Sequence, residues 1–279
     1  MIFLLVLALV WILFAAVSDL RSREVPDYIS FSFITFALAY RAFYAVFNSD
    51  VWFFLFGVIF LVGFIVLGYA FYYGRVFAGG DAKLMMALGA VLPLYPTLIE
   101  NIKFSFIFVI LLMFSGAIYG LVYSCSLFVI HFKEARREFS KQFFARRNTL
   151  YLYGGLAVVM LFFPVYLNES ALFLVPLVLI VFPFLYSFAK AVENVCLIRE
   201  IDTKNLTEGD WIYKPVRIGN KIVKPDWEGL SKQDMALLRK RNKLVWVKEG
   251  IPFVPAFLVA FLILVYLWYS SWSFFQIWF

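Results

Sequence analysis

The chain has 279 residues, of which 64% are hydrophobic and 21% aromatic, while only 15% are charged, and its mean hydropathy is +0.87. Such a composition provides too little polar surface for a soluble enzyme of this size. The formal net charge of +7 comes from basic residues gathered between apolar stretches, so it indicates membrane topology more than nucleic-acid binding.

The apolar stretches predict an all-α polytopic membrane protein with about eight transmembrane helices. None of them alternates in polarity as the strands of an outer-membrane barrel do. The first stretch lacks the positive start of a secretory signal peptide, so we expect it to remain as a helix. The expected spans are 1–17, 28–47, 52–73, 84–99, 104–131, 150–167, 170–190 and 251–275.

The connections between these spans differ in charge. The connections 48–51, 100–103 and 168–169 contain a single lysine, whereas most basic residues lie in the other four connections. Because basic residues resist translocation, this asymmetry predicts that the N- and C-termini both lie outside the plasma membrane and that the basic segments face the cytoplasm.

The segment 191–250 is less apolar and predicts a small cytoplasmic α+β subdomain inserted before the last helix. Gly219-Asn220 is typical of a two-residue hairpin loop, and Ser231 with Asp234 resembles a capping box at a helix start. The expected elements are strands at 211–218, 221–224 and 244–247 and a helix at 232–243. The predicted domains are a membrane domain over 1–190, this subdomain over 191–250, and a final transmembrane helix over 251–279.

Two aspartates are candidates for catalysis because ionisable groups at a membrane are costly to place. Asp19 follows the first span and Asp81 precedes the fourth, so the intervening pair of helices returns the chain to the same face. Gly79 and Gly80 would let another helix end approach Asp81 closely. Two carboxyls sharing one site hold a single proton near neutral pH, which suits general acid–base hydrolysis of a peptide bond.

Simpler roles are also open. Asp81 is placed where an N-cap would be, and we assign Asp27 to capping of the second helix and Glu24 to a solvated loop. Arg41, inside the second span, is expected to extend its side chain outward to the membrane surface. Two isolated cysteines and one histidine predict neither a disulfide nor a metal site.

The sequence resembles a known family in three segments. These are 19–26 (DLRSREVP), 80–84 (GDAKL) and 248–257 (KEGIPFVPAF), and they are similar to the type IV prepilin peptidases, in particular their archaeal preflagellin/prepilin peptidase branch. The resemblance implies a membrane aspartic protease of the GxGD class, with Asp19 and Asp81 as catalytic residues.

The resemblance also implies roles for neighbouring residues. Gly80 matches the glycine before the second aspartate, whereas the first glycine of GxGD falls on Ala78, and Gly79 supplies the flexibility that is lost there. Arg21 and Lys83 match basic positions of the two motifs.

The implied substrates are prepilin-like or preflagellin (archaellin) precursors, whose short basic class III signal peptides would be removed at the cytoplasmic face. Membrane lipids are the other expected partner, and no nucleic acid is expected. The Cys-x-x-Cys pairs of many bacterial members are missing from the sequence, so we expect neither methyltransferase activity nor a cofactor or metal.

Two other classes remain open. A presenilin-like intramembrane protease would also pair two aspartates, although 255–257 only partly matches the Pro-Ala-Leu signature of that class. A transporter or assembly platform would use the acidic residues for ion coupling, but the inverted repeats typical of many transporters are not evident.

Overall fold

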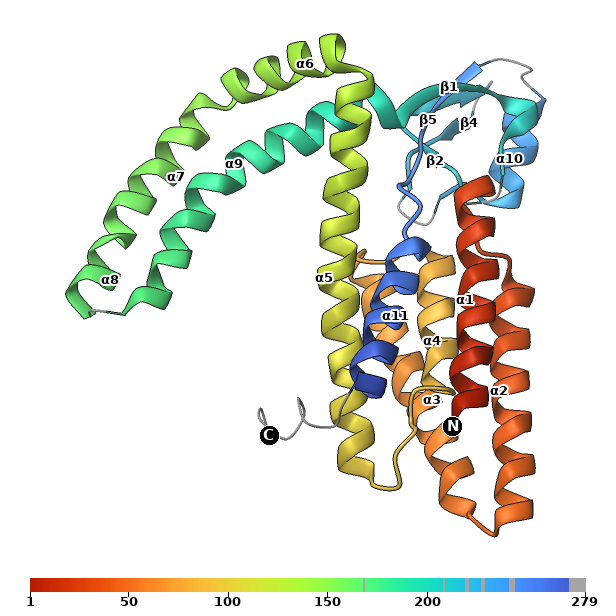
Figure 1. Cartoon of the computed structure of the whole chain (residues 1–279). Coiled ribbons are helices and arrows are strands. Elements are labelled where there is room, and N and C mark those ends of the chain that lie inside the picture. Colours follow the sequence, from red (N-terminus) through yellow and green to blue (C-terminus); the bar gives the residue numbers. More distant parts are fainter. Residues whose placement is uncertain (168, 208, 219–220, 227–228, 241–243, 271–279) are drawn as a thin grey trace. The chain divides into compact units, whose positions relative to one another are not determined.

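The computed structural model is mostly helical and divides into two compact units (Figure 1). The first unit comprises Met1–Leu121 and the chain from Ile251 onward, and the second comprises Val122–Gly250. The structure describes all residues except 168, 208, 219–220, 227–228, 241–243 and 271–279.

The first unit is a bundle of helices around an apolar core. α1 packs against α2 and α11, and α4 packs against α2 and α3, so the last helix of the unit lies beside the first (Figure 1). Its helices are α1 (Ile2–Ser22), α2 (Asp27–Asn48), α3 (Val51–Tyr73), α4 (Gly79–Gly89), the first part of α5 (Leu98–Ile130) and α11 (Val254–Ser270).

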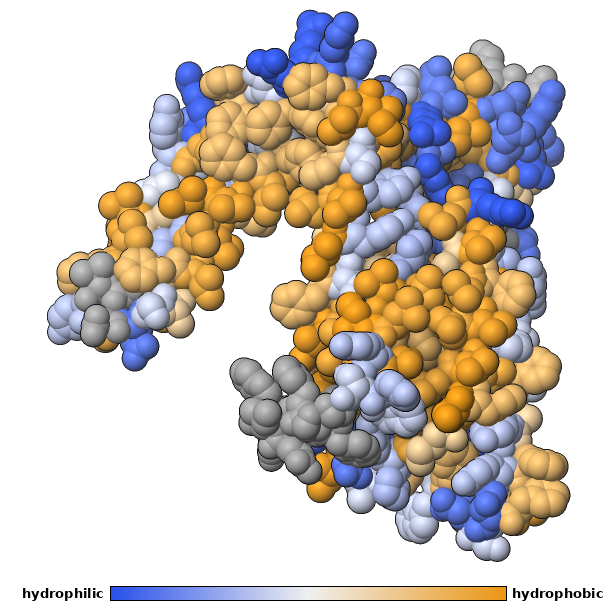
Figure 2. Space-filling model, in the orientation of Figure 1, coloured by the Kyte–Doolittle hydropathy of each residue, from blue (hydrophilic) through white to orange (hydrophobic). Residues whose placement is uncertain are grey.

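The outer surface of this bundle is apolar as well. Large side chains such as Phe14 and Val66 are each 65% exposed, and Figure 2 shows orange, hydrophobic residues over the visible helices. A surface of this kind suits lipid chains better than water. Within the described residues, the helices that are long and apolar enough to cross a membrane are Ile2–Ser22, Asp27–Asn48, Val51–Tyr73, Leu98–Ile130 and Ser170–Leu197.

These five helices confirm a polytopic helical membrane protein, whereas the count of eight spans stays a prediction. The expected span 84–99 differs most from the structure. Its helix, α4, begins earlier, ends at Gly89 and is followed by irregular chain through Pro93 and Pro96. Proline has no N–H to continue a helix, which explains the break. The Asn101 side chain holds this segment by bonding both the N–H and the carbonyl of Tyr95, at 2.8 and 2.9 Å.

Arg41 of α2 corrects a second expectation. Its side chain is fully buried and points into the bundle, where its guanidinium donates hydrogen bonds of 2.5 to 3.1 Å to backbone carbonyls. The extension toward the membrane surface expected from sequence is therefore wrong. The cation instead ties α2 to α3 and to the chain that follows α4, where carbonyls at the helix end have no partner within the helix. The acceptors are Phe53, Ala90, Val91 and Pro93.

The second unit continues from the end of α5 into a long helical hairpin. The chain runs out through α6, α7 and α8 and returns along α7 and α6 through α9 (Figure 1). The sequence predicts only a connection at 132–149, because α6 has charged residues on one face and so fails a search for uniformly apolar segments. The elements are α6 (Phe132–Ala145), α7 (Arg147–Met160), α8 (Phe162–Leu167), the 3-10 turn η1 (Ser170–Phe173), α9 (Leu174–Val192) and the π-helical turn η2 (Glu193–Leu197).

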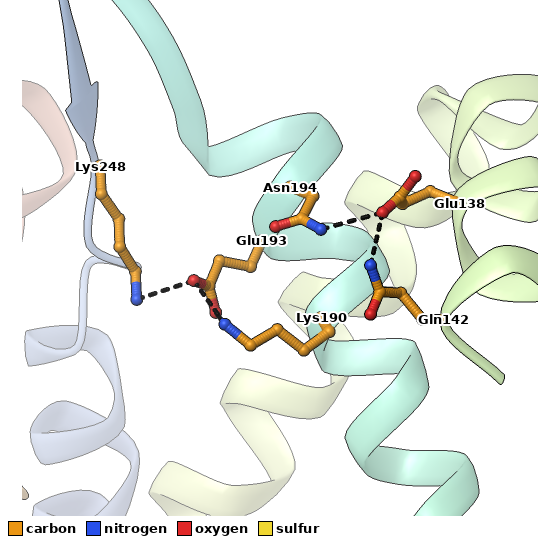
Figure 3. Close-up of polar contacts among 6 residues, drawn as sticks. All are labelled: Glu138, Gln142, Lys190, Glu193, Asn194 and Lys248. Atoms are coloured by element: carbon orange, nitrogen blue, oxygen red, sulfur yellow. Dashed lines mark hydrogen bonds and ion pairs between the residues drawn. The ribbon is translucent and has the colours of Figure 1, made fainter. Parts of the chain in front are cut away.

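Polar side chains join these helices to the strands that follow (Figure 3). Glu138 of α6 accepts a hydrogen bond from Asn194 of η2 at 3.0 Å. Glu193 forms ion pairs with Lys190 at 3.0 Å and with Lys248 at 3.1 Å. The cluster therefore fixes η2 between α6 and the strand that carries Lys248.

The rest of the second unit contains two small antiparallel sheets and one helix. Three strands form a sheet in the order β1-β5-β2, and β3 pairs with β4. Their shared apolar core includes Ile212, Leu238 and Val245. The elements are β1 (Ile198–Asp202), β2 (Trp211–Ile212), β3 (Val216–Ile218), β4 (Lys221–Val223), α10 (Lys232–Arg239), β5 (Leu244–Lys248) and the 3-10 turn η3 (Thr203–Asn205).

Several expectations for this region can be compared with the structure. Ile218 pairs with Lys221 across the predicted hairpin, whose loop Gly219-Asn220 lies outside the described residues, as does the predicted helix end at 241–243. Ser231 accepts the Asp234 N–H at 3.2 Å, as the capping pattern predicts. The strand expected at 211–218 is instead split into β2 and β3 around Pro215, which cannot donate to a ladder.

Candidate active site

Asp19 lies in the last turns of α1 and is only 5% exposed. The sequence places it after the first helix, but α1 continues to Ser22, so the carboxyl belongs to the helix and faces the interior. Its Oδ2 accepts a hydrogen bond of 2.9 Å from the backbone N–H of Val254, the first residue of α11. A carboxylate at a helix N-terminus is stabilised by the free N–H groups there.

Asp81 is the third residue of α4 and is 8% exposed. Its pKa is raised to about 7, first by burial and then by the nearby charge of Asp19, while a backbone hydrogen bond from Ala78 opposes both effects. Asp19 is thus close enough to raise the pKa of Asp81, although 62 residues separate the two in the sequence.

Asp81 does not occupy the N-cap position that the sequence also allowed for it. The residue that caps α4 is Ala78, which has no side-chain cap bond, and Asp81 sits three residues later. From there its carboxylate receives a backbone bond from Ala78, as the acidic residue of a capping box does. Asp81 therefore contributes to the helix start, but its burial beside Asp19 exceeds what capping requires.

The two glycines before Asp81 have different surroundings. A Cβ on Gly80 would lie 3.1 Å from Cβ and 3.3 Å from the backbone N of Val25, a buried residue in the connection after α1. Gly80 therefore permits the close approach of this connection to α4 that the sequence led us to expect. A Cβ on Gly79 would meet only a ring carbon of Tyr72, at 3.8 Å. A side chain at position 79 would therefore make only an ordinary van der Waals contact.

The two basic motif residues lie near the protein surface. Lys83 of α4 forms an ion pair with Asp27, whose carboxylate is 58% exposed. Asp27 is the first residue of α2 and its N-cap is Pro26, so the capping role assigned to Asp27 is wrong. The ion pair instead links the starts of α2 and α4. Arg21 is exposed in the last turn of α1, and Glu24 is exposed in the connection, as predicted for a solvated loop.

Reasoning from sequence missed the part that α11 plays. The start of this helix contacts Asp19 through Val254 and places the ring of Phe253 5.4 Å from that of Phe77, four residues before Asp81. The prolines at 252 and 255 mark a helix start in the sequence. Nothing in the sequence, however, shows which carboxyl that start would meet.

Two interacting, buried carboxyls within a bundle of lipid-compatible helices form the kind of site that a membrane aspartic peptidase needs. Comparison with known proteins points to the same region of the chain. Residues 6–123 match the type IV leader peptidase family, and this segment includes both Asp19 and Asp81.

Two archaeal relatives match within the chain. It is 33% identical over 94 residues to prepilin peptidase EppA of Methanothermobacter thermautotrophicus and 39% identical over 87 residues to the preflagellin peptidase of Methanocaldococcus jannaschii. These segments cover 34% and 30% of this chain, and only 24% and 36% of the two relatives. The resemblance to type IV prepilin peptidases that the sequence indicates is confirmed over this part of the chain.

Proposed function

We propose that the protein is a membrane-embedded aspartic endopeptidase that removes short basic leader peptides from prepilin-like or preflagellin-like precursors. The observation that carries this proposal is the burial of Asp19 and Asp81 next to each other, within the segment that matches the leader peptidase family. The names of the two relatives support the substrate class.

The chemistry follows from one proton shared by two carboxyls. The ionised carboxylate takes a proton from water as the water oxygen attacks the peptide carbonyl, and the protonated carboxyl donates to the carbonyl oxygen. Collapse of the resulting tetrahedral diol breaks the C–N bond: one diol hydroxyl returns its proton to the ionised carboxylate, while the protonated carboxyl donates its proton to the leaving nitrogen. One water is consumed, a carboxylic acid and an amine are released, and the pair again holds one proton.

We infer that the site faces the cytoplasm. The positive residues of the connections favour this orientation, with both termini outside and eight crossings in total. A leader at the cytoplasmic face would then place its junction with the following apolar helix near Asp19 and Asp81. The apolar outer surface of the bundle provides a face on which such a helix could pack, next to membrane lipid.

The test is cleavage of a co-expressed precursor in membranes. The wild-type protein should remove the leader from a pilin-like or archaellin-like precursor, which mass spectrometry detects as a loss of the leader mass. Asp19→Asn and Asp81→Asn each preserve side-chain shape but remove a titratable carboxyl, so each should abolish cleavage.

Asp27→Asn is the matched control because it neutralises a third carboxyl close in sequence to Asp19 but outside the buried pair. It should keep cleavage. Leader removal by either dyad variant would exclude the proposed chemistry, and an uncut precursor with all four proteins would favour a transporter or assembly platform.

A further inference from the structure

The start of α11 contacts both of the segments that carry the aspartates. Val254 is fully buried, and its backbone N–H donates a hydrogen bond of 2.9 Å to Asp19 Oδ2. A second backbone hydrogen bond to Asp19 comes from Phe253. Asp19 thus receives two N–H groups from one helix start, where the helix dipole also favours negative charge.

The same turn reaches the segment before Asp81 through an aromatic contact. The Phe253 ring lies 5.4 Å from Phe77 and 5.9 Å from Phe257, and the Phe77 ring lies 5.7 Å from Phe257. Phe77 is 5% exposed, so this three-ring cluster is a packed contact. The start of α11 therefore contacts Asp19 through its backbone and contacts the chain that leads into Asp81 through its aromatic rings.

Gly116 of α5 provides the space that Phe253 occupies. A Cβ at this glycine would lie 2.4 Å from Cζ and 2.7 Å from Cε2 of the Phe253 ring. The ring cannot keep its position if position 116 carries any side chain. By contrast, a Cβ at Gly120, one turn further along α5, would meet nothing within 4 Å.

The first turn of α11 acts on the ionisation of Asp19 separately from the charged groups around this carboxyl. Arg23, which follows α1, acts on Asp19 electrostatically, and Asp19 in turn acts on Asp81 of α4. Asp27 of α2 is paired with Lys83. Residues 254–270 of α11 contain no Asp, Glu, Lys, Arg or His, so α11 acts on Asp19 through its backbone.

We propose that the first turn of α11 is a positioning element of the active site, which keeps Asp19 as the ionised base and thereby leaves the shared proton on Asp81. This inference rests on the proposed peptidase function and assigns different roles to the two carboxyls. Hydrogen bonds from N–H groups stabilise a carboxylate more than a carboxylic acid. Asp19 accepts two of them, and Asp81 receives one, from Ala78.

The decisive variant is Val254→Pro, which removes the N–H that bonds Asp19 while keeping a residue that suits the first position of a helix. Val254→Ala truncates the side chain but retains the N–H, and it is the reference. The measurement is kcat/KM for leader cleavage as a function of pH in detergent or proteoliposomes. We expect the acid limb of the Val254→Pro profile to lie about one pH unit above that of Val254→Ala, the effect of one charge-assisted hydrogen bond.

Gly116→Ala tests the same element without changing its backbone. The displaced Phe253 ring should move the helix start, shift the acid limb in the same direction and lower kcat more than it raises KM. Gly120→Ala should behave as the wild type. These glycine variants decide the question alone if Val254→Pro does not fold.

Acid limbs that coincide for Val254→Pro and Val254→Ala would overturn the inference, and so would equal profiles for the two glycine variants. These outcomes are distinct from failure of the proposed function, which would show as an inactive wild type or as cleavage by Asp19→Asn. A wild type that cleaves, together with inactive Asp19→Asn and unshifted profiles, would leave the peptidase proposal intact and refute only the role of α11.

Discussion

Gly80→Ala tests whether close approach to the connection after α1 positions Asp81. The added methyl would lie 3.1 Å from Val25 Cβ and 3.3 Å from its backbone N, and both atoms belong to a residue that is only 8% exposed. One neighbour must therefore move by a few tenths of an ångström. Overpacking of this kind costs about 1–3 kcal/mol of folding free energy. Because Asp81 is the next residue, we also expect cleavage to fall by about tenfold or more.

Gly79→Ala is the matched control one residue earlier in the same helical turn. Its methyl would meet Tyr72 at 3.8 Å, an ordinary contact, and alanine favours a helix over glycine by about 0.5–1 kcal/mol. Thermal unfolding in detergent and the cleavage rate should therefore separate the two variants: Gly79→Ala stays equal to or slightly more stable than the wild type, and Gly80→Ala loses on both measurements. Equal behaviour of the two would show that contact with Val25 does not position the dyad.

Three further predictions concern charge. The pKa of Asp81 is raised from 3.8 to about 7, so its contribution to stability is complete below about pH 4 and is lost as pH rises through about 7. The stability lost over this range is about 4 kcal/mol. The pH dependence of thermal unfolding should therefore flatten in Asp81→Asn. Arg41→Met should lower the unfolding temperature in detergent by several degrees, because buried carbonyls that lose a donor cost about 1–3 kcal/mol each, and an unchanged temperature would contradict this account. The Asp27–Lys83 pair is about half exposed, so Lys83→Met should change stability by less than about 1 kcal/mol in chemical denaturation, and a larger loss would mean that Lys83 has another role.

Much of the fold follows from apolar length, because a helix that crosses lipid must be continuous and apolar. The expected spans agree with the ends of α1, α2, α3 and α5 to within six residues. The fourth span was not, since the chain after Gly89 obtains its polar partners from Arg41 and Asn101, which lie far away in the sequence or after the break. The hydropathy of the segment gives no signal of either interaction. It overlooks α6 for another reason, because an amphipathic helix has a low average hydropathy.

The site was predictable to the extent that one local pattern marks each half of it. The glycines before Asp81 and the returning pair of helices predict that Asp19 and Asp81 approach each other, and the charge of Asp19 does raise the pKa of Asp81. The third component was not predictable, because the donor at position 254 is a backbone N–H 235 residues away from Asp19. Every residue except proline has such a donor, so side-chain identity gives no signal.

The buried guanidinium of Arg41 also bears on how the protein enters the membrane. A lone arginine within a helix in lipid costs about 3 kcal/mol or more, and three of its four acceptors, at 90, 91 and 93, enter only after α4 has been made. The second helix is thus unstable in the bilayer until the helix that contains Asp81 has packed against it. Incomplete chains would keep an unsatisfied cation in lipid, so we expect the first four helices to become stable together. A copy that persists in the membrane is one in which Asp81 has already been brought to its place.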